Sequence, residues 1–571
     1  MRVMMAILLV VSLAALVGAA EGLAAREFPV CTYPGSVQQM PVVSGSRIVW
    51  CDQRGVDEGE EHIDTANDIY VYDFATGVET AICTEGNDQV YPSIDGDRIV
   101  WRDDRSGQWE IWMHDLSTGI TGKVADAPTG YHWEALGPDI SGEIIVWADD
   151  HNHPVSHNLD VYMYDLSTET QTRLTEADAQ QGYLGPRVHG GKVVWLDFSV
   201  SPIGDIRMYD VGTETVSVVS GSEPMGRGQV DIWGDIVVWT QATGEGNWGI
   251  WYRDLAEVNP AELGEREYVQ DMARVGGRWV TWLDDYVGGG DQFYNEIRVY
   301  DLEQGAESGL TESAHPYSEQ AASVSDSGLV VWMDWRNGDR STYFNPDIYG
   351  YVLTRFWDVL ANHWAYDAIE GCVEAEVVSG YLEGDYRPSA VVTRDQMAVY
   401  IARALAGGDG NVPEGPETAS FEDVPNTGYG DSGTDPHWAY KYVEYAVDCS
   451  VVQGYAYDDP ENPGETIYRY EPTWTVTRDQ MAVYVARAMV APTGEAALED
   501  YVPSDPRNFP DVPNTGYGDG GTDPFWAYTH IEYCVENGVV SGYDDGYYRP
   551  EWVVTRDQMA VYVARAFGLG G

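Results

Sequence analysis

The sequence predicts a multidomain protein, an all-β seven-bladed β-propeller followed by three small, mainly α-helical modules. Two repeat series predict this architecture. Seven copies of an apolar strand ending in Trp recur up to residue 353, and three copies of a different, helix-bearing unit follow. A chain of 571 residues is also too long for one ordinary hydrophobic core, which agrees with several domains.

Residues 1–25 have the features of a secretory signal peptide. Arg2 supplies a positive charge, an apolar run extends from Met4 to about Val17, and small residues follow up to Ala25. The apolar run is shorter than the roughly 20 residues that a membrane-spanning helix needs. We therefore expect an exported protein without a transmembrane anchor.

Residues 26–353 contain the propeller repeat. Each unit has a short apolar strand ending in Trp, then a strand that alternates with period two, such as residues 68–73. Turns such as residues 115–119 follow, in which Gly tolerates positive φ. Four short strands in a unit of about 43 to 51 residues are typical of propeller blades. The repeated Trp residues are Trp50, Trp101, Trp147, Trp195, Trp239, Trp282 and Trp332.

The two ends of this region predict how the ring closes. The seventh unit lacks an outer strand, while the chain starts with a spare one, because residues 29–32 match residues 81–84. Both segments lead to a proline that opens the next unit, Pro41 or Pro92. We expect the N-terminal strand to complete the last blade beside residues 347–352, which leaves no open sheet edge.

On this blade pattern, residues 26–353 resemble the TolB-like family of β-propellers. The resemblance implies the fold and says little of function, because function depends on sites placed on a fold. Members of the family commonly act as binding platforms. We therefore expect the propeller to bind a protein or glycan partner whose identity the sequence does not give.

The second repeat series predicts helices. Each copy has Phe-x-Asp-Val, a Trp-Ala pair with a short helix, Gly-Tyr, and then Thr-Arg-Asp-Gln before an apolar stretch. Thr followed three residues later by Gln is a capping box, so a longer helix begins there. Met397, Ile401 and Leu405 form one apolar stripe on it. Each copy is too small to bury a core alone, so we expect the three to pack together.

This ordered combination of motifs resembles the S-layer homology family. The resemblance predicts modules at 354–405, 421–489 and 509–568, joined by Gly- and Pro-rich linkers at 406–420 and 490–508. It implies grooves between the modules that bind cell-wall polysaccharide through an Asp, a Trp and the helix-start Arg of each copy. Those residues are Asp358, Trp364, Arg394, Asp423, Trp438, Arg478, Asp511, Trp526 and Arg556.

Two alternatives accompany this assignment. The three Arg residues could instead form ion pairs with neighbouring carboxylates, although Arg suits planar anions, and the three Trp residues could lie in the core. The family usually has Thr-Arg-Ala-Glu where all three copies here have Thr-Arg-Asp-Gln. The capping role survives this change. The carboxylate has moved, so the ligand could differ from the usual pyruvylated polymer.

Composition narrows the class of partner. The formal net charge is −61, from 93 acidic and 32 basic residues, and such a surface repels nucleic acid and anionic lipid. Six Cys are too few for a disulfide scaffold in an exported chain. Cys31 and Cys83 occupy matching repeat positions, as do Cys372 and Cys534, so we expect them to be small buried side chains.

We expect no cofactor, although two loop regions raise weaker metal hypotheses. Residues 425–431 and 513–519, with Asp435 and Asp523, offer oxygen ligands for calcium, and an ordinary polar loop is the alternative. A histidine cluster in the third blade could hold a metal or form a solvated loop. The cluster consists of His151, His153 and His157 beside Asp149 and Asp150.

The chain lacks the common catalytic signatures, namely a Gly-x-Ser-x-Gly elbow, His-Glu-x-x-His and a phosphate loop. We therefore predict a non-catalytic protein of the cell surface, anchored to the envelope by its modules. The alternative is a wall-attached, glycan-active hydrolase with its active site on the propeller. Paired carboxylates at the central mouth of the propeller would favour that alternative.

Overall fold

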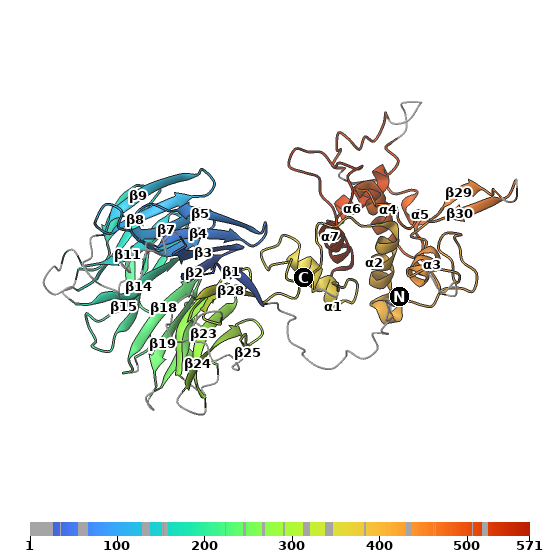
Figure 1. Ribbon diagram of the computed structural model, residues 1–571. Helices are drawn as coiled ribbons and strands as arrows, with labels where there is room; N and C mark the ends of the chain where they lie inside the picture. Colours follow the sequence, from blue (N-terminus) through green and yellow to red (C-terminus); the bar gives the residue numbers. More distant parts are fainter. Residues whose placement is uncertain are drawn as a thin grey trace. The chain divides into compact units, whose positions relative to one another are not determined.

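Antiparallel sheets form the N-terminal part of the computed structural model, and helices form the C-terminal part (Figure 1). The chain divides into two compact units, Met1–Leu360 and Ala361–Gly571. Each unit corresponds closely to one repeat series. The structure describes residues 27–570 except 35, 55–66, 128–136, 151, 153–157, 177–178, 223, 244–246, 265–268, 289–291, 312–319, 337–345, 382–383, 430–434, 461, 463, 505 and 517–523.

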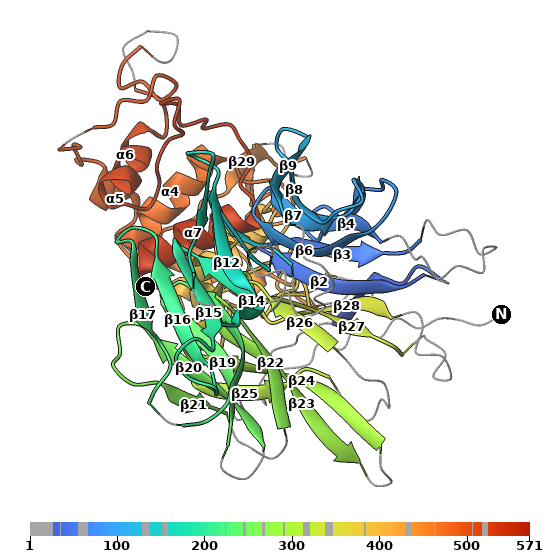
Figure 2. The ribbon, with the colours of Figure 1, turned by 90° about the vertical axis from the view of Figure 1, so that its left-hand side faces the viewer.

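The described residues of the first unit form seven four-stranded sheets, set like blades around a centre (Figure 2). In the first six blades the strands pair in chain order. The repeated Trp of every blade is fully buried, as expected for a strand covered on both faces. Blades 1 to 3 consist of β2 (Gln38–Ser44), β3 (Arg47–Asp52), β4 (Asp68–Asp73), β5 (Val78–Cys83); β6 (Gln89–Asp95), β7 (Arg98–Asp103), β8 (Glu110–Asp115), β9 (Ile120–Asp126); and β10 (Asp139–Ser141), β11 (Ile144–Asp149), β12 (Asp160–Asp165), β13 (Thr170–Arg173). Blades 4 to 6 consist of β14 (Gln181–His189), β15 (Lys192–Asp197), β16 (Asp205–Asp210), β17 (Thr215–Val218); β18 (Arg227–Trp233), β19 (Ile236–Ala242), β20 (Trp248–Asp254), β21 (Ala261–Leu263); and β22 (Val269–Gly276), β23 (Trp279–Gly288), β24 (Gln292–Asp301), β25 (Ala306–Gly309).

The seventh blade joins the two ends of the propeller and confirms the predicted closure. Its strand order is β1–β28–β27–β26, so the N-terminal strand is outermost. Phe28 pairs with Gly350, and Cys31 pairs with Ile348. The Phe28 ring covers Gly350 so closely that an added Cβ would lie 2.5 Å from it. The strands are β1 (Glu27–Cys31), β26 (Gln320–Val324), β27 (Leu329–Asp334) and β28 (Asp347–Val352).

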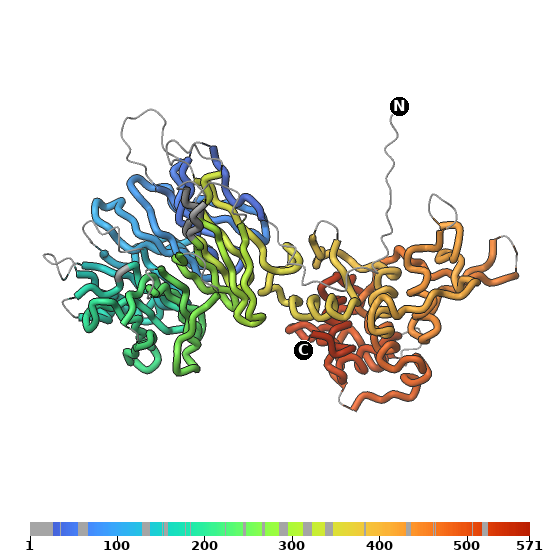
Figure 3. The backbone as a smooth tube through the Cα atoms, turned by 90° about the horizontal axis from the view of Figure 1, so that it is seen from below, coloured from blue at the N-terminus to red at the C-terminus, as the bar shows by residue number. Residues whose placement is uncertain are grey.

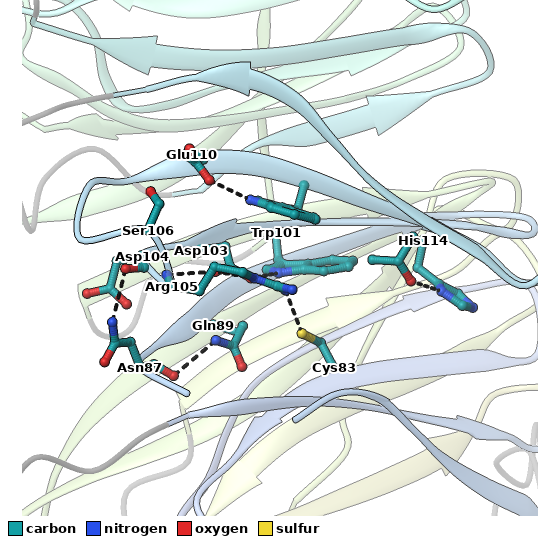
Figure 4. Close-up of polar contacts among 12 residues, drawn as sticks. Cys83, Asn87, Gln89, Trp101, Asp103, Asp104, Arg105, Ser106, Glu110 and His114 are labelled. Atoms are coloured by element: carbon teal, nitrogen blue, oxygen red, sulfur yellow. Dashed lines mark hydrogen bonds and ion pairs between the residues drawn. The ribbon is translucent and has the colours of Figure 1, made fainter. Parts of the chain in front are cut away.

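A Trp–Asp–Arg cluster strengthens the boundary between blades. In blade 2 the Trp101 indole donates to Asp103 at 2.9 Å, and Arg105 pairs with the same carboxylate at 2.6 Å (Figure 4). The Arg105 guanidinium lies 4.0 Å from the centroid of the Trp112 ring and donates to Cys83 Sγ at 2.9 Å. Because Cys83 belongs to the outer strand of blade 1, the cluster connects two blades.

The cysteines occupy the environments that the repeats predict. Cys31 accepts from Arg54 at 3.1 Å between blades 7 and 1, as Cys83 accepts from Arg105 between blades 1 and 2. In the second unit Cys372 and Cys534 each contact a helical carbonyl oxygen at 3.5 Å. These four side chains are buried, and all six cysteines are free thiols.

The described residues of the second unit form three long and three short helices, whose backbones Figure 3 traces in yellow to red. The long helices α2, α4 and α7 contact one another, while α1 packs on α7, α3 on α2 and α6 on α4. Every short helix therefore covers the long helix of a different module. The bounds are α1 (Tyr366–Glu374), α2 (Arg394–Ala406), α3 (Tyr440–Asp448), α4 (Arg478–Met489), α6 (Tyr528–Glu536) and α7 (Arg556–Phe567), with smaller elements η1 (Asp409–Asn411), β29 (Tyr455–Asp458), β30 (Thr466–Arg469) and α5 (Glu495–Leu498).

The starts of the long helices confirm the predicted capping boxes. Thr393, Thr477 and Thr555 are the N-caps, each in a reciprocal box with the Gln three residues later. Gln therefore does the capping work of the more usual Glu. None of the helices among the described residues has the length and apolar character needed to cross a membrane.

Removing β1 should open the propeller ring. A chain starting at residue 36 lacks the outer strand of blade 7 and exposes β28 as an edge. We expect its propeller to melt at least about 5 °C below that of a chain starting at residue 27, because a loss of a few kcal/mol shifts Tm by that amount. Differential scanning calorimetry measures both, with the transition of the C-terminal unit as internal control. Equal propeller melting temperatures would contradict the role of β1.

Candidate functional site

Three junctions between modules repeat around the centre of the second unit. A closed ring of backbone hydrogen bonds, each 2.9 Å, runs from Val392 to Val554, from Val554 to Val476 and from Val476 back to Val392. We call the contact of α2 with module 2 junction 1–2, that of α4 with module 3 junction 2–3, and that of α7 with module 1 junction 3–1. The ring gives the three junctions the same backbone geometry.

The helix-start arginines lie inside these junctions. Arg394, Arg478 and Arg556 are only 3–5% exposed. Arg394 Nε donates to the carbonyl oxygen of Tyr470 at 2.7 Å, and its guanidinium also reaches the hydroxyl of Tyr484, both in module 2. Arg478 repeats these contacts with module 3, and Arg556 repeats them with module 1. Each Arg therefore joins its own module to the next one.

Aromatic rings and neutral acceptors surround these buried charges. The Arg394 guanidinium lies 4.6 Å from the centroid of the Tyr470 ring and 5.0 Å from that of Tyr455. Burial raises the pKa of Tyr484 to about 12, against the lowering effect of Arg394, so its hydroxyl is a neutral acceptor at ordinary pH. Within the described part of the chain, the Arg394 guanidinium contacts hydroxyl and carbonyl oxygens and aromatic rings, and no ion pair with a carboxylate is found there.

The Asp of Thr-Arg-Asp-Gln holds a tryptophan of the neighbouring module. Asp395 Oδ1 accepts from the Thr393 hydroxyl and, at 2.8 Å, from the backbone N–H of Gln396. Its Oδ2 accepts from the Trp438 indole at 3.1 Å. The same indole contact joins Trp526 to Asp479 at 3.0 Å and Trp364 to Asp557 at 3.1 Å. This departure from the family pattern therefore fixes the orientation of three Trp rings.

Those Trp rings are open to solvent. Trp364, Trp438 and Trp526 are 61%, 51% and 51% exposed, so they do not lie in the core. The structure thus brings each predicted Trp and the helix-start Arg of the preceding module to one junction, with an Asp between them. An exposed aromatic face held in a fixed orientation can pack on a sugar ring.

The Asp of Phe-x-Asp-Val accepts hydrogen bonds from the backbone of its own module in the second and third copies. Asp423 accepts the backbone N–H of Tyr470 at 2.7 Å and that of Glu471 at 2.8 Å. Asp511 does the same for Tyr548 and Arg549. Both carboxylates therefore hold the backbone of the residue whose carbonyl oxygen accepts from the buried Arg, Tyr470 or Tyr548.

Sequence reasoning missed further aromatic residues at the junctions. Trp474 and Trp552 are 50% and 53% exposed, and their carbonyl oxygens accept from the backbone N–H groups of Arg394 and Arg478. The third junction has Ala390 at this position. The recurrence of an aromatic-x-Pro segment before each helix was the signal that could have identified them.

The metal hypotheses gain no support. Among the residues that the structure describes, no three His, Cys, Asp or Glu side chains are grouped to hold a metal ion. His151, His153 and His157 lie outside the described residues, as do residues 430–431 and 517–519 of the Gly-rich loops and Asp523. The calcium and histidine hypotheses therefore stay predictions.

The buried arginines should stabilise the second unit strongly. Replacing Arg478 by Met leaves the carbonyl oxygens of Tyr548 and Ser541 without their donor, so we expect unfolding to need about 3 kcal/mol less. The matched control is Arg549→Met, which removes a solvent-exposed ion pair with Asp545 and should cost about 1 kcal/mol or less. Urea unfolding followed by circular dichroism compares them. Equal losses would contradict the role assigned to Arg478.

Comparison with known proteins agrees with this geometry. A family model of the S-layer homology domain matches residues 355–398 and 509–560. The chain is 26% identical over 209 residues to an endoglucanase of Bacillus sp. (strain KSM-635), which covers 37% of this chain and 18% of the endoglucanase. It is 26% identical over 178 residues to the cellulosome-anchoring protein of Acetivibrio thermocellus, which covers 31% of each. The chain thus spans less than a third of either relative.

The propeller also resembles solved structures in fold. One is the β-propeller domain of the Trilobed protease from Pyrococcus furiosus, with 13% identity and a TM-score of 0.41, covering 57% of this chain and 98% of that one. Within the second unit, the module between the two matched segments repeats their capping boxes and junction contacts. The C-terminal part of the chain therefore carries S-layer homology domains, matched at residues 355–398 and 509–560.

Proposed function

We propose that this is an exported protein attached non-covalently to the cell envelope, with wall polysaccharide bound at its module junctions. The observation that carries the proposal is the half-exposed Trp held by an Asp at each of three junctions. The ring presents an apolar face on which a sugar ring can pack, and the buried Asp holds the indole in a fixed orientation.

Within this site the predicted residues divide the work. Trp364, Trp438 and Trp526 would contact the polymer. Arg394, Arg478 and Arg556 would set the shape of each junction, because their guanidinium groups are occupied by the neighbouring module. Asp423 and Asp511 would brace the receiving segments of their own modules.

Three junctions on one chain suit attachment to a repeating polymer. Weak sites on one scaffold combine through effective concentration, so total binding can exceed that of one junction by orders of magnitude. The names of two relatives, a cellulosome-anchoring protein and an endoglucanase, fit a module that holds different partners at the surface. The propeller would then be the displayed part, binding a protein or glycan. The wall-attached hydrolase stays an untested alternative.

Removing the three exposed indoles should release the protein from envelopes. We expect the variant Trp364→Ala, Trp438→Ala and Trp526→Ala to bind purified envelopes about 10-fold more weakly or worse, because all junctions lose their apolar face together. The measurement is co-sedimentation of the full chain with envelopes over a concentration series, with folding checked by circular dichroism.

The matched control is Tyr33→Ala with Tyr468→Ala, which removes two exposed aromatic rings outside the described Trp–Asp contacts. This control should sediment like the wild type. A wild-type chain that does not sediment would exclude envelope attachment. A folded indole variant that sediments like the wild type would place attachment elsewhere on the chain.

A further inference from the structure

A cavity of about 530 Å³ occupies the middle of the propeller. The inner strands of all seven blades line it, namely β2, β6, β10, β14, β18, β22 and β26. Its volume lies in the range of small-molecule sites, which are mostly apolar with a few placed polar groups. The question is which polar groups face it and whether they already have partners.

One position of the inner strand repeats around this cavity. In every blade it pairs with the residue immediately before the buried Trp of the next strand. In blades 3 to 6 the residues at this position alternate in charge, while the other three blades have small or apolar ones. The seven residues are Val42, Ser93, Asp139, Arg187, Asp231, Arg274 and Ser323, and all of them line the cavity.

The two acids of this ring are occupied by the fold. Asp139 accepts the backbone N–H of Val188 and the hydroxyl of Ser93, both at 2.8 Å. Asp231 accepts the backbone N–H of Val275 at 3.0 Å. Each carboxylate thus reaches the inner strand of the next blade and fastens it, instead of neutralising a guanidinium by direct contact.

The two arginines of this ring have no carboxylate of a described residue in direct contact. Among the described residues, neither Arg187 nor Arg274 has a carboxylate within ion-pair distance, although Asp231 attracts both from farther away. Arg187 has no hydrogen-bond partner among those residues. Arg274 donates to the Ala273 carbonyl at 3.0 Å, and a suitably oriented Gln229 amide accepts from it at 2.7 Å. Burial, followed by the charge of Arg187, lowers the pKa of Arg274 to about 10, against the raising effect of the nearby acids.

Arg187 and Arg274 repel each other, and Asp231, on the blade between theirs, attracts both without forming an ion pair, so an anion in contact with both guanidinium groups would relieve this repulsion. We infer that the propeller cavity binds a small organic monocarboxylate, with its carboxylate between Arg187 and Arg274 and its body against Met40, Tyr91 and Met272. Guanidinium groups pair with planar carboxylates through two parallel hydrogen bonds. A single negative charge fits better than two, because the carboxylates of Asp95, Asp139 and Asp231 also line the cavity and outnumber the two arginines, which disfavours a dianion such as phosphate.

This inference concerns the propeller alone, so the failure of envelope attachment would leave it intact. The test is isothermal titration calorimetry of the full chain with two probes, D-glucuronate and N-acetyl-leucine. Each has a neutral counterpart, methyl glucuronate ester and N-acetyl-leucine amide. We expect at least one acid to bind at least 10-fold more tightly than its neutral counterpart, and which one binds distinguishes a sugar acid from a peptide end. No binding of either acid would overturn the inference.

Substitution separates a binding role from a structural one. Arg187→Gln should weaken the bound acid at least 10-fold and leave the melting temperature equal or higher, since it removes the charge that opposes Arg274. The control is Arg98→Gln. Arg98 lies in blade 2 and pairs with Glu143 outside the cavity, so this variant should bind the acid with the affinity of the wild type. An Arg187→Gln variant that binds like the wild type, or that loses both binding and several degrees of stability, would overturn the inference.

Discussion

No single repeat of this protein is large enough to bury its own core, so every unit must complete its neighbour. In the second unit this constraint takes the form of a buried Arg that each module inserts into the next, together with the backbone ring of Val392, Val476 and Val554. The three contacts form a cycle, so no module is terminal. The solvent-facing chemistry, the Trp held by an Asp, exists only because this cycle brings two modules together.

The sequence was most informative where structure is local or repeated. The capping boxes follow from residues three apart, and the strand count follows from the spacing of the buried Trp residues. The ring closure was predictable because residues 29–32 match residues 81–84, the end of the outer strand of a complete blade. In each case, the observation and the structure it predicts lie within one repeat or in two copies of it.

The site was predictable in its residues and not in its contacts. Arg394 and its equivalents donate to backbone carbonyl oxygens of the following module, and no side-chain pattern records where a carbonyl oxygen will lie. The Asp of Thr-Arg-Asp-Gln was recognised as a departure, yet its partner, a Trp of another module, depends on the packing angle of whole helices. The sequence did not reveal the alternating charges of the propeller cavity, because the residues that carry them are separated by one whole blade of the chain.

The pairing of β1 with β28 joins residues about 320 positions apart. Contacts of such sequence separation form late, because all the intervening chain must first be brought into a closed loop. A polypeptide that is made and threaded from its N-terminus cannot complete the propeller until Val352 has emerged. Throughout the synthesis of the first six blades the chain therefore holds an unclosed ring, in which β1 has not yet met β28.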